Sequence, residues 1–74
     1  VTLGPGESLP EETPHSGEEF GYVLSGTMTL RIGKQTYKLG PKHCFYFEAH
    51  QTHQFENRGK NPVNFLWITS PPQM

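Results

Sequence analysis

Short runs of apolar and β-branched residues are separated by turn residues along the whole chain. Within the runs, apolar and polar side chains alternate with a period of two, which is typical of half-buried β-strands. No window of eleven or more residues has a helical period that is free of glycine or proline. The pattern therefore predicts an all-β sandwich, barrel or jelly roll, with strands within residues 1–3, 18–26, 27–33, 36–39, 44–49, 51–59 and 62–69.

The length predicts one small domain over residues 1–70 with a tail at 71–74. A chain of this size buries only about 60% of its unfolded surface, so we expect a partner, most simply a homodimer. A single cysteine, Cys44, fits a reducing compartment and a cytoplasmic location. No apolar run is long enough to span a membrane, so no membrane partner is expected.

Charge argues against direct nucleic-acid binding by this segment. Six Lys and Arg residues balance seven Asp and Glu residues, and the basic residues are scattered along the chain. Phosphate backbones are bound by clustered basic residues, which this chain lacks. Because the chain begins at Val1, we expect it to be a segment of a longer protein.

Three side chains form the candidate chemistry. His15 and Glu19 are four residues apart at the start of one strand, and His53 lies in a later strand. If both strands face the interior, two imidazoles and one carboxylate could hold a divalent Zn, Fe, Mn or Ni ion. Their spacing alone favours a loop histidine, a solvated carboxylate and an ordinary polar residue with no metal, because three scattered residues of these types occur by chance in many chains. His43 and His50 lie among turn residues and are interpreted as ordinary surface histidines.

The two candidate strands resemble the two sequence motifs of the cupin superfamily. "HSGEEFGYVLSG" matches the second histidine, the glutamate and the glycine of the first motif at His15, Glu19 and Gly26. "HQFEN" matches the histidine and asparagine of the second motif at His53 and Asn57. The resemblance implies a cupin-type jelly-roll β-barrel, the double-stranded β-helix, with a metal site at His15, Glu19 and His53.

The chain departs from the motifs at the first metal ligand. Thr13 stands where the family has its first histidine, and Lys42-His43 stands where the second motif begins with Gly-Asp. A threonine hydroxyl is a poor ligand for these metals, so the implied ligand set shrinks to three residues and weaker metal binding is expected.

The chain is most similar to the C-terminal cupin domain of bacterial transcriptional regulators that have a phage-repressor-type helix-turn-helix. The carrying segments are residues 15–33, 44–57 and 66–72. This resemblance implies a small-molecule effector in the barrel, a homodimer and an upstream DNA-binding domain outside this chain. The residues expected to bind the effector are Thr13, His15, Glu19, Gln51 and His53 as polar anchors, and Val23, Phe45, Phe47, Phe55 and Trp67 as apolar walls.

Two other functions remain open at this point. A metal at His15, Glu19 and His53 could serve a free-standing dioxygenase or isomerase, with Glu48 or His50 as a proton carrier. The missing ligand makes this enzyme alternative the weaker one, and no catalytic residue is assigned. The chain could also be a dimerisation module, because Phe20, Tyr22, Phe45 and Phe47 fit a core or a dimer interface as well as a ligand box.

Overall fold

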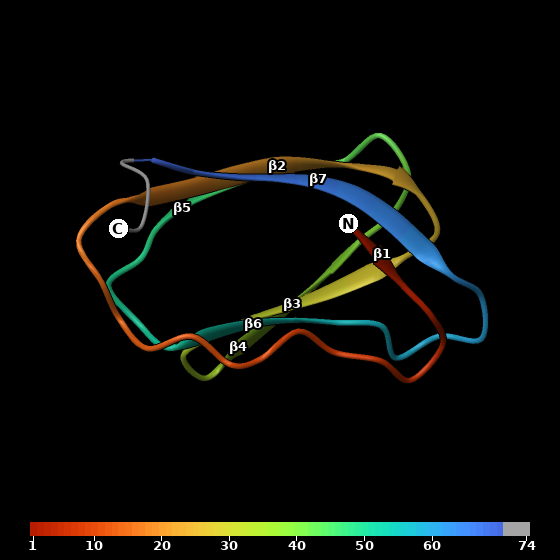
Figure 1. Ribbon diagram of the computed structural model, residues 1–74, viewed down its shortest axis with the longest axis horizontal. Helices are drawn as coiled ribbons and strands as arrows, with labels where there is room; N and C mark the ends of the chain where they lie inside the picture. The colour runs from red at the N-terminus through yellow and green to blue at the C-terminus, as the bar shows by residue number, and fades with distance from the viewer. Residues whose placement is uncertain (71–74) are drawn as a thin grey trace.

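The computed structural model describes residues 1–70, and all regular elements among them are strands (Figure 1). The all-β prediction is confirmed. The strands coincide with the seven predicted runs, except that β4 and β7 each extend one residue beyond them. They are β1 (Thr2–Leu3), β2 (Glu18–Ser25), β3 (Met28–Ile32), β4 (Gln35–Leu39), β5 (Cys44–Glu48), β6 (His53–Glu56) and β7 (Val63–Ser70). The tail predicted at 71–74 lies outside the described residues.

The strands form two antiparallel sheets that face each other (Figure 1). The first sheet has the order β1-β7-β2-β5, and the second has the order β4-β3-β6. Strands that are distant in sequence therefore lie side by side, as β2 does with β7. This arrangement brings both halves of the chain to one interior.

The core lies between the sheets and is built from alternate residues of each strand. In β2, Glu19 and Val23 are fully buried, whereas Phe20 and Leu24 are exposed. The sequence left open which of these two faces points inward. Phe55 of β6 is central, because its ring contacts the rings of Phe45, Phe65 and Trp67 at centroid distances of 5.4, 5.3 and 4.9 Å. Burial of one such side chain stabilises the fold by roughly 1.5–3 kcal/mol.

The interior and exterior aromatic residues separate cleanly in the structure. Phe45 is buried and Phe47 is half-buried on the inner face of β5. Phe20 and Tyr46 are exposed on the outer face of the same sheet. The four aromatic residues that the sequence could not assign thus divide into core and surface pairs, with Phe20 and Tyr22 belonging to the outer face.

Asn57 holds the end of the barrel opposite the candidate site. Its side chain is buried, and its Nδ2 donates to the carbonyl oxygens of Leu3 and Asn61 at 3.0 and 2.8 Å. Its Oδ1 accepts a bond from the backbone N–H of Gly59 at 2.9 Å. The motif asparagine therefore fixes the turn between β6 and β7 against β1.

The loop before β2 runs along the outer edge of β6. Two isolated bridges join them, Ser8 with Glu56 and Glu12 with His53. At the second bridge the Glu12 N–H donates to the His53 carbonyl at 2.8 Å, and the reverse bond measures 3.0 Å. The bridge fixes Glu12 beside His53. Within residues 1–70, no helix is long and apolar enough to cross a membrane.

Gly21 is required by close packing on the inner face of β2. A Cβ built at this position would overlap the Leu66 carbonyl oxygen and the Phe45 ring. We therefore expect Gly21→Ala to lower the free energy of unfolding by about 1–3 kcal/mol, because the ring and the strand must move apart. Gly40→Ala is the control, since its Cβ would lie at least 3.7 Å from the nearest atoms. Urea unfolding measures both, and equal stability of the two variants would contradict the packing.

Candidate metal centre

Four side chains from two sheets and one loop meet at one end of the interior. Glu19 comes from β2, His53 comes from β6, and Glu12 and His15 come from the loop between β1 and β2. One ligand atom from each lies within 4.8 Å of all the others. The cluster is open on one side, because Glu19 and His53 are fully buried while the side chains of Glu12 and His15 are 36% and 16% exposed.

The two carboxylates contact both imidazoles through the Nε2 atoms. His53 Nε2 lies 2.5 Å from Glu19 Oε2 and 2.9 Å from Glu12 Oε1. His15 Nε2 lies 3.0 Å from Glu19 Oε2 and 3.7 Å from Glu12 Oε1. Two nitrogen atoms and two carboxylate oxygens thus surround one point.

The hydrogen bond of the other ring nitrogen of His53 indicates that the cluster requires a positive charge. His53 Nδ1 lies 2.9 Å from the Gln51 carbonyl oxygen. A carbonyl only accepts hydrogen bonds, so Nδ1 carries a proton and Nε2 of the neutral ring carries a lone pair. A lone pair facing two carboxylates is repulsive unless a proton or a metal ion supplies positive charge between them. A backbone carbonyl on the far nitrogen is also the usual arrangement of a metal-binding histidine.

The donor set fits a divalent metal ion. Two neutral imidazoles and two carboxylates carry a formal charge of −2, which a divalent cation neutralises. Ligands at bond lengths of about 2.0–2.2 Å lie roughly 3–4.4 Å apart around a shared ion. The N–O separations of 2.9, 3.0 and 3.7 Å are close to this range, whereas the 2.5 Å contact between His53 and Glu19 would have to widen. The oxygen and imidazole set suits Zn, Fe, Mn or Ni and disfavours metals that need thiolates.

Trp67 orients one of the carboxylates. Its Nε1 donates to Glu19 Oε1 at 2.6 Å, which leaves Oε2 directed at the histidines. The sequence predicted Trp67 as an apolar wall and did not predict this hydrogen bond. Phe47 lies on the other side of the cluster, with its ring centroid 5.2 Å from that of His53. Both residues restrict the directions in which the ligands can move.

The structure brings the three predicted ligands together and adds Glu12, which the sequence analysis did not include. Thr13 is exposed and lines a shallow cleft of about 300 Å³ with Glu11, Glu12 and His15. Thr13, predicted as a lesser polar anchor, lies in a loop without strand geometry and is not one of the four clustered side chains. Glu12 could have been found from the sequence, because it is adjacent to Thr13, the position where the family has its first histidine.

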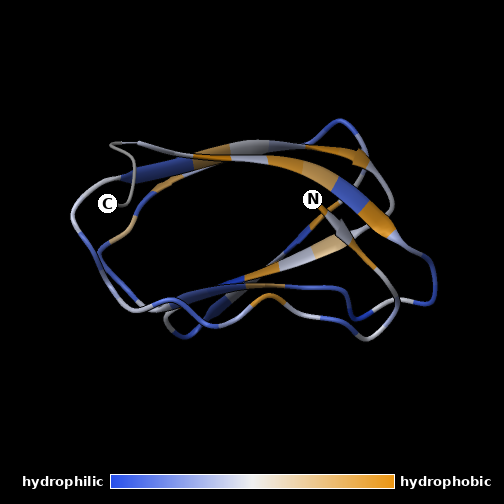
Figure 2. Cartoon of the chain, in the orientation of Figure 1, coloured by the Kyte–Doolittle hydropathy of each residue, from blue (hydrophilic) through white to orange (hydrophobic). Residues whose placement is uncertain are grey.

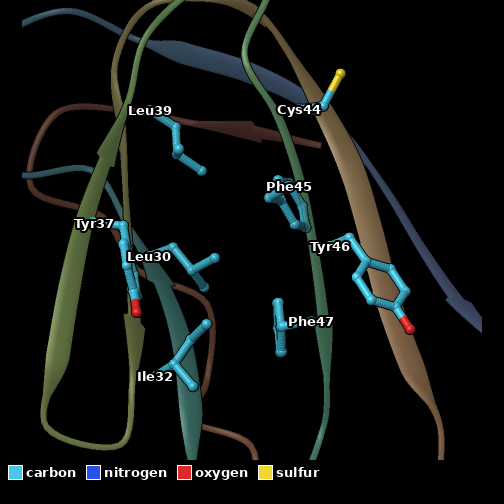
Figure 3. Close-up of a pocket in the computed structure, with 8 residues that line it drawn as sticks. All are labelled: Leu30, Ile32, Tyr37, Leu39, Cys44, Phe45, Tyr46 and Phe47. Atoms are coloured by element: carbon cyan, nitrogen blue, oxygen red, sulfur yellow. The ribbon is translucent and has the colours of Figure 1, made fainter.

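The predicted apolar walls all lie on the inner faces of the sheets, but they surround different spaces. Val23 and Phe55 are fully packed in the core. Phe45 and Phe47 border a separate cleft of about 340 Å³ between β3, β4 and β5, together with Leu30, Ile32, Tyr37 and Leu39. Figure 3 shows Phe45 and Phe47 pointing toward Leu30 and Ile32, while Cys44 and Tyr46 point away. Gln51 is exposed and reaches the cluster through its backbone carbonyl.

The remaining histidines lie apart from the cluster. His43 Nδ1 accepts a bond from the Gly40 N–H at 2.8 Å. His50 pairs with Glu48 at 3.1 Å, and both side chains are more than half exposed. Neither belongs to the group of metal-ligating side chains found among residues 1–70.

Comparison with known proteins gives a consistent family. The family model for the cupin domain matches residues 1–69, in agreement with the resemblance inferred from the two motifs. The chain is similar to the structure of the cupin domain of an XRE family transcriptional regulator from Enterobacter cloacae. The two are 28% identical with a TM-score of 0.84, over 97% of this chain and 77% of that one.

Other relatives include a regulator and an enzyme. The HTH-type transcriptional regulator PuuR of Escherichia coli is 30% identical over 95% of this chain and 38% of its own length. The structure of a sugar phosphate isomerase from Silicibacter pomeroyi is 28% identical with a TM-score of 0.81, over 96% of this chain and 47% of that one. The chain spans about half or less of the length of the curated relatives that it matches.

Glu12 is expected to act as the fourth ligand. Glu12→Gln should weaken the binding of Zn²⁺ or Mn²⁺ at least tenfold, because it removes one of the two charges that neutralise the ion. Trp67, the single tryptophan of the chain, donates to Glu19 and should report binding through its fluorescence. Glu11→Gln is the matched control, since the Glu11 carboxylate pairs with Arg31 at 2.8 Å. Equal metal affinity of the two variants would exclude Glu12 from the site.

Proposed function

This chain belongs to the cupin domain family, and from that premise we propose that it is the effector-sensing and dimerisation domain of a bacterial transcriptional regulator. The observation that carries the proposal is a partly buried two-histidine, two-glutamate cluster beside an apolar cleft, in a chain similar to the cupin domains of regulators. DNA would be bound by an upstream domain outside this chain, and the protein would act in the cytoplasm.

The proposed cofactor is one divalent metal ion held by Glu12, His15, Glu19 and His53. Trp67 and the Gln51 carbonyl would keep two of these ligands in position. An ion that takes five or six ligands, such as Mn, Fe or Ni, would leave room for an effector where the cluster reaches solvent, at the shallow cleft over Glu12 and His15. An effector with a carboxylate or carbonyl oxygen could then bind the metal directly.

The apolar cleft indicates the chemistry of the part of the effector that does not bind the metal. Its volume of about 340 Å³ is at the lower end of small-molecule sites, and its walls are mainly aliphatic and aromatic. The Phe47 ring lies between this cleft and His53. A small ring or short hydrocarbon body with one acidic group would combine the two environments, with Phe47 moving to join them.

Sensing requires the effector to bind two states of the protein with different affinity, because equal binding shifts no equilibrium. Glu19 and Trp67 belong to β2 and β7, two of the strands that carry the outer surface of the four-stranded sheet. A ligand that shifts these side chains would therefore alter a surface available to a second copy. The dimer in turn would set the spacing of the two DNA-binding domains.

The alternative function is a small metal-dependent enzyme. The same four ligands could activate water or polarise a substrate carbonyl, and the 28% identity with a sugar phosphate isomerase favours this reading. Glu48 and His50 form an exposed ion pair and are the remaining candidates for a proton carrier. A helix-turn-helix encoded upstream in the same gene would favour the regulator, and an independent start codon near residue 1 would favour the enzyme.

The regulator proposal predicts a metal-dependent affinity for DNA. In the full-length protein, removing the ion with a chelator should change the affinity for its own promoter DNA at least fivefold, a typical size of allosteric coupling. His53→Gln should abolish this response, whereas His50→Gln, outside the cluster, should retain it. Fluorescence anisotropy with labelled promoter DNA measures the affinity. A promoter affinity that ignores both the ion and His53→Gln would argue against metal-linked sensing.

The apolar cleft predicts binding of small aromatic acids. Benzoate and phenylacetate should raise the midpoint of thermal unfolding of the metal-loaded domain by mass action. Ile32→Phe places a ring in the cleft and should remove this rise, whereas Leu24→Phe, on the exposed face of β2, should keep it. Differential scanning fluorimetry is the measurement. A rise of equal size in both variants would move the binding site elsewhere.

A further inference from the structure

The outer face of the four-stranded sheet carries a continuous apolar surface. Five of its large apolar residues are between 37% and 60% exposed. Figure 2 shows the apolar stretches along β2 and β7, and Figure 1 shows that no other strand covers this side of the sheet within residues 1–70. The outer patch is defined by Phe20, Tyr22, Leu24, Tyr46, Leu66 and Ile68.

The strand register joins all of these side chains except Leu24 into two adjacent rows. Phe20 of β2 is paired with Tyr46 of β5 on one side and Ile68 of β7 on the other. Tyr22 is paired in the same way with Cys44 and Leu66. The rows are two residues apart on the same face, so the outer patch crosses three strands without a polar interruption. The centre of the patch lies over the backbone of Gly21, Phe45 and Trp67, which form the row between the two, and the side chains of Phe45 and Trp67 point inward.

The area of the outer patch matches one half of a stable interface. Five residues at about half exposure, with roughly 200 Å² for a large apolar side chain, give on the order of 500 Å². This value is near the upper limit for a patch on a monomeric protein, about 300–600 Å². A standard interface buries about 800 Å² per partner, of which roughly 60% is apolar, so the expected apolar area is about 480 Å².

We propose that this patch is the surface through which two copies of the chain associate, sheet against sheet. The inference rests on the dimerisation part of the proposed function and names its surface. In a two-fold dimer the same patch supplies both sides, so the area that a second copy needs is already present. Phe20, Tyr22 and Tyr46 also give the patch the aromatic content that is enriched in interface cores.

Charges at the two ends of the patch determine the orientation of the second copy. Glu18 and Glu48 are paired in the register at one end, and Lys42 precedes β5 at the other. If the strands of the two copies ran in parallel, four carboxylates would meet, which is destabilising. With the strands antiparallel and the two-fold axis over the central row, Phe20 lies over Tyr22 of the second copy and Glu48 lies over its Lys42.

The first experiment measures the sedimenting mass of the parent chain and of variants within and outside the patch. We expect this chain to sediment at twice its mass of 8.4 kDa at micromolar concentration. Ile68→Lys should weaken the dimer at least a hundredfold, because it buries charges in an apolar contact. Tyr37→Lys is the control, since Tyr37 is also an exposed aromatic residue but lies on the other sheet. Circular dichroism confirms that each variant is folded.

A second set of variants avoids changes to apolar residues and tests the orientation. Lys42→Glu and Glu48→Lys should each weaken the dimer at least tenfold, and the double variant should restore it because the opposite charges face each other again. A monomeric parent would overturn both the dimer and the patch. If Ile68→Lys remains dimeric, or if Tyr37→Lys weakens the dimer as much as Ile68→Lys does, the assignment of the interface to this patch would be overturned. Failure of the double variant to recover would overturn the antiparallel orientation.

Discussion

The contact between Glu19 and His53 connects the two sheets at the end of the molecule that carries the candidate site. Glu19 belongs to the four-stranded sheet and His53 to the three-stranded sheet, and both are fully buried. A buried carboxylate is costly unless a positive charge and hydrogen bonds compensate it. Here Trp67, His15 and His53 all lie around Glu19. The arrangement is therefore stable only while this end of the interior supplies positive charge.

At the opposite end of the interior, the buried polar groups are satisfied without a charge. There Asn57 satisfies two backbone carbonyls and one N–H, and it needs no ion to do so. Between the two ends, Phe55 and Phe65 form an apolar layer in which their rings contact each other. β6 and the residue that follows it thus place three alternate side chains inward, with His53 in the candidate site, Phe55 in the core and Asn57 at the turn. Period-two alternation alone produces this order.

The strands and much of the candidate site could be predicted from the sequence, because period-two alternation and motif spacing are local signals. His15, Glu19 and His53 were found in this way. Glu12 was missed because its position depends on a backbone bridge to His53, a contact across 41 residues that no local pattern encodes. Trp67 was found as an inward residue, but its hydrogen bond to Glu19 depends on the pairing of β2 with β7. The inward face of each strand likewise became clear only when the sheets were paired.

The alternation of β2 has a consequence for how the two sides of the sheet communicate. Glu19 points to the interior and Phe20 points to the outer face, so one peptide unit separates a candidate metal ligand from an apolar surface residue. No chain of intermediate residues is needed to connect them. Because the two residues share a peptide unit, a change in the backbone angles at Glu19 also moves the side chain of Phe20 on the opposite face. If the site binds an ion, linkage requires the effect to be reciprocal, so a partner bound to the outer face of β2 would change the ion affinity by the same factor.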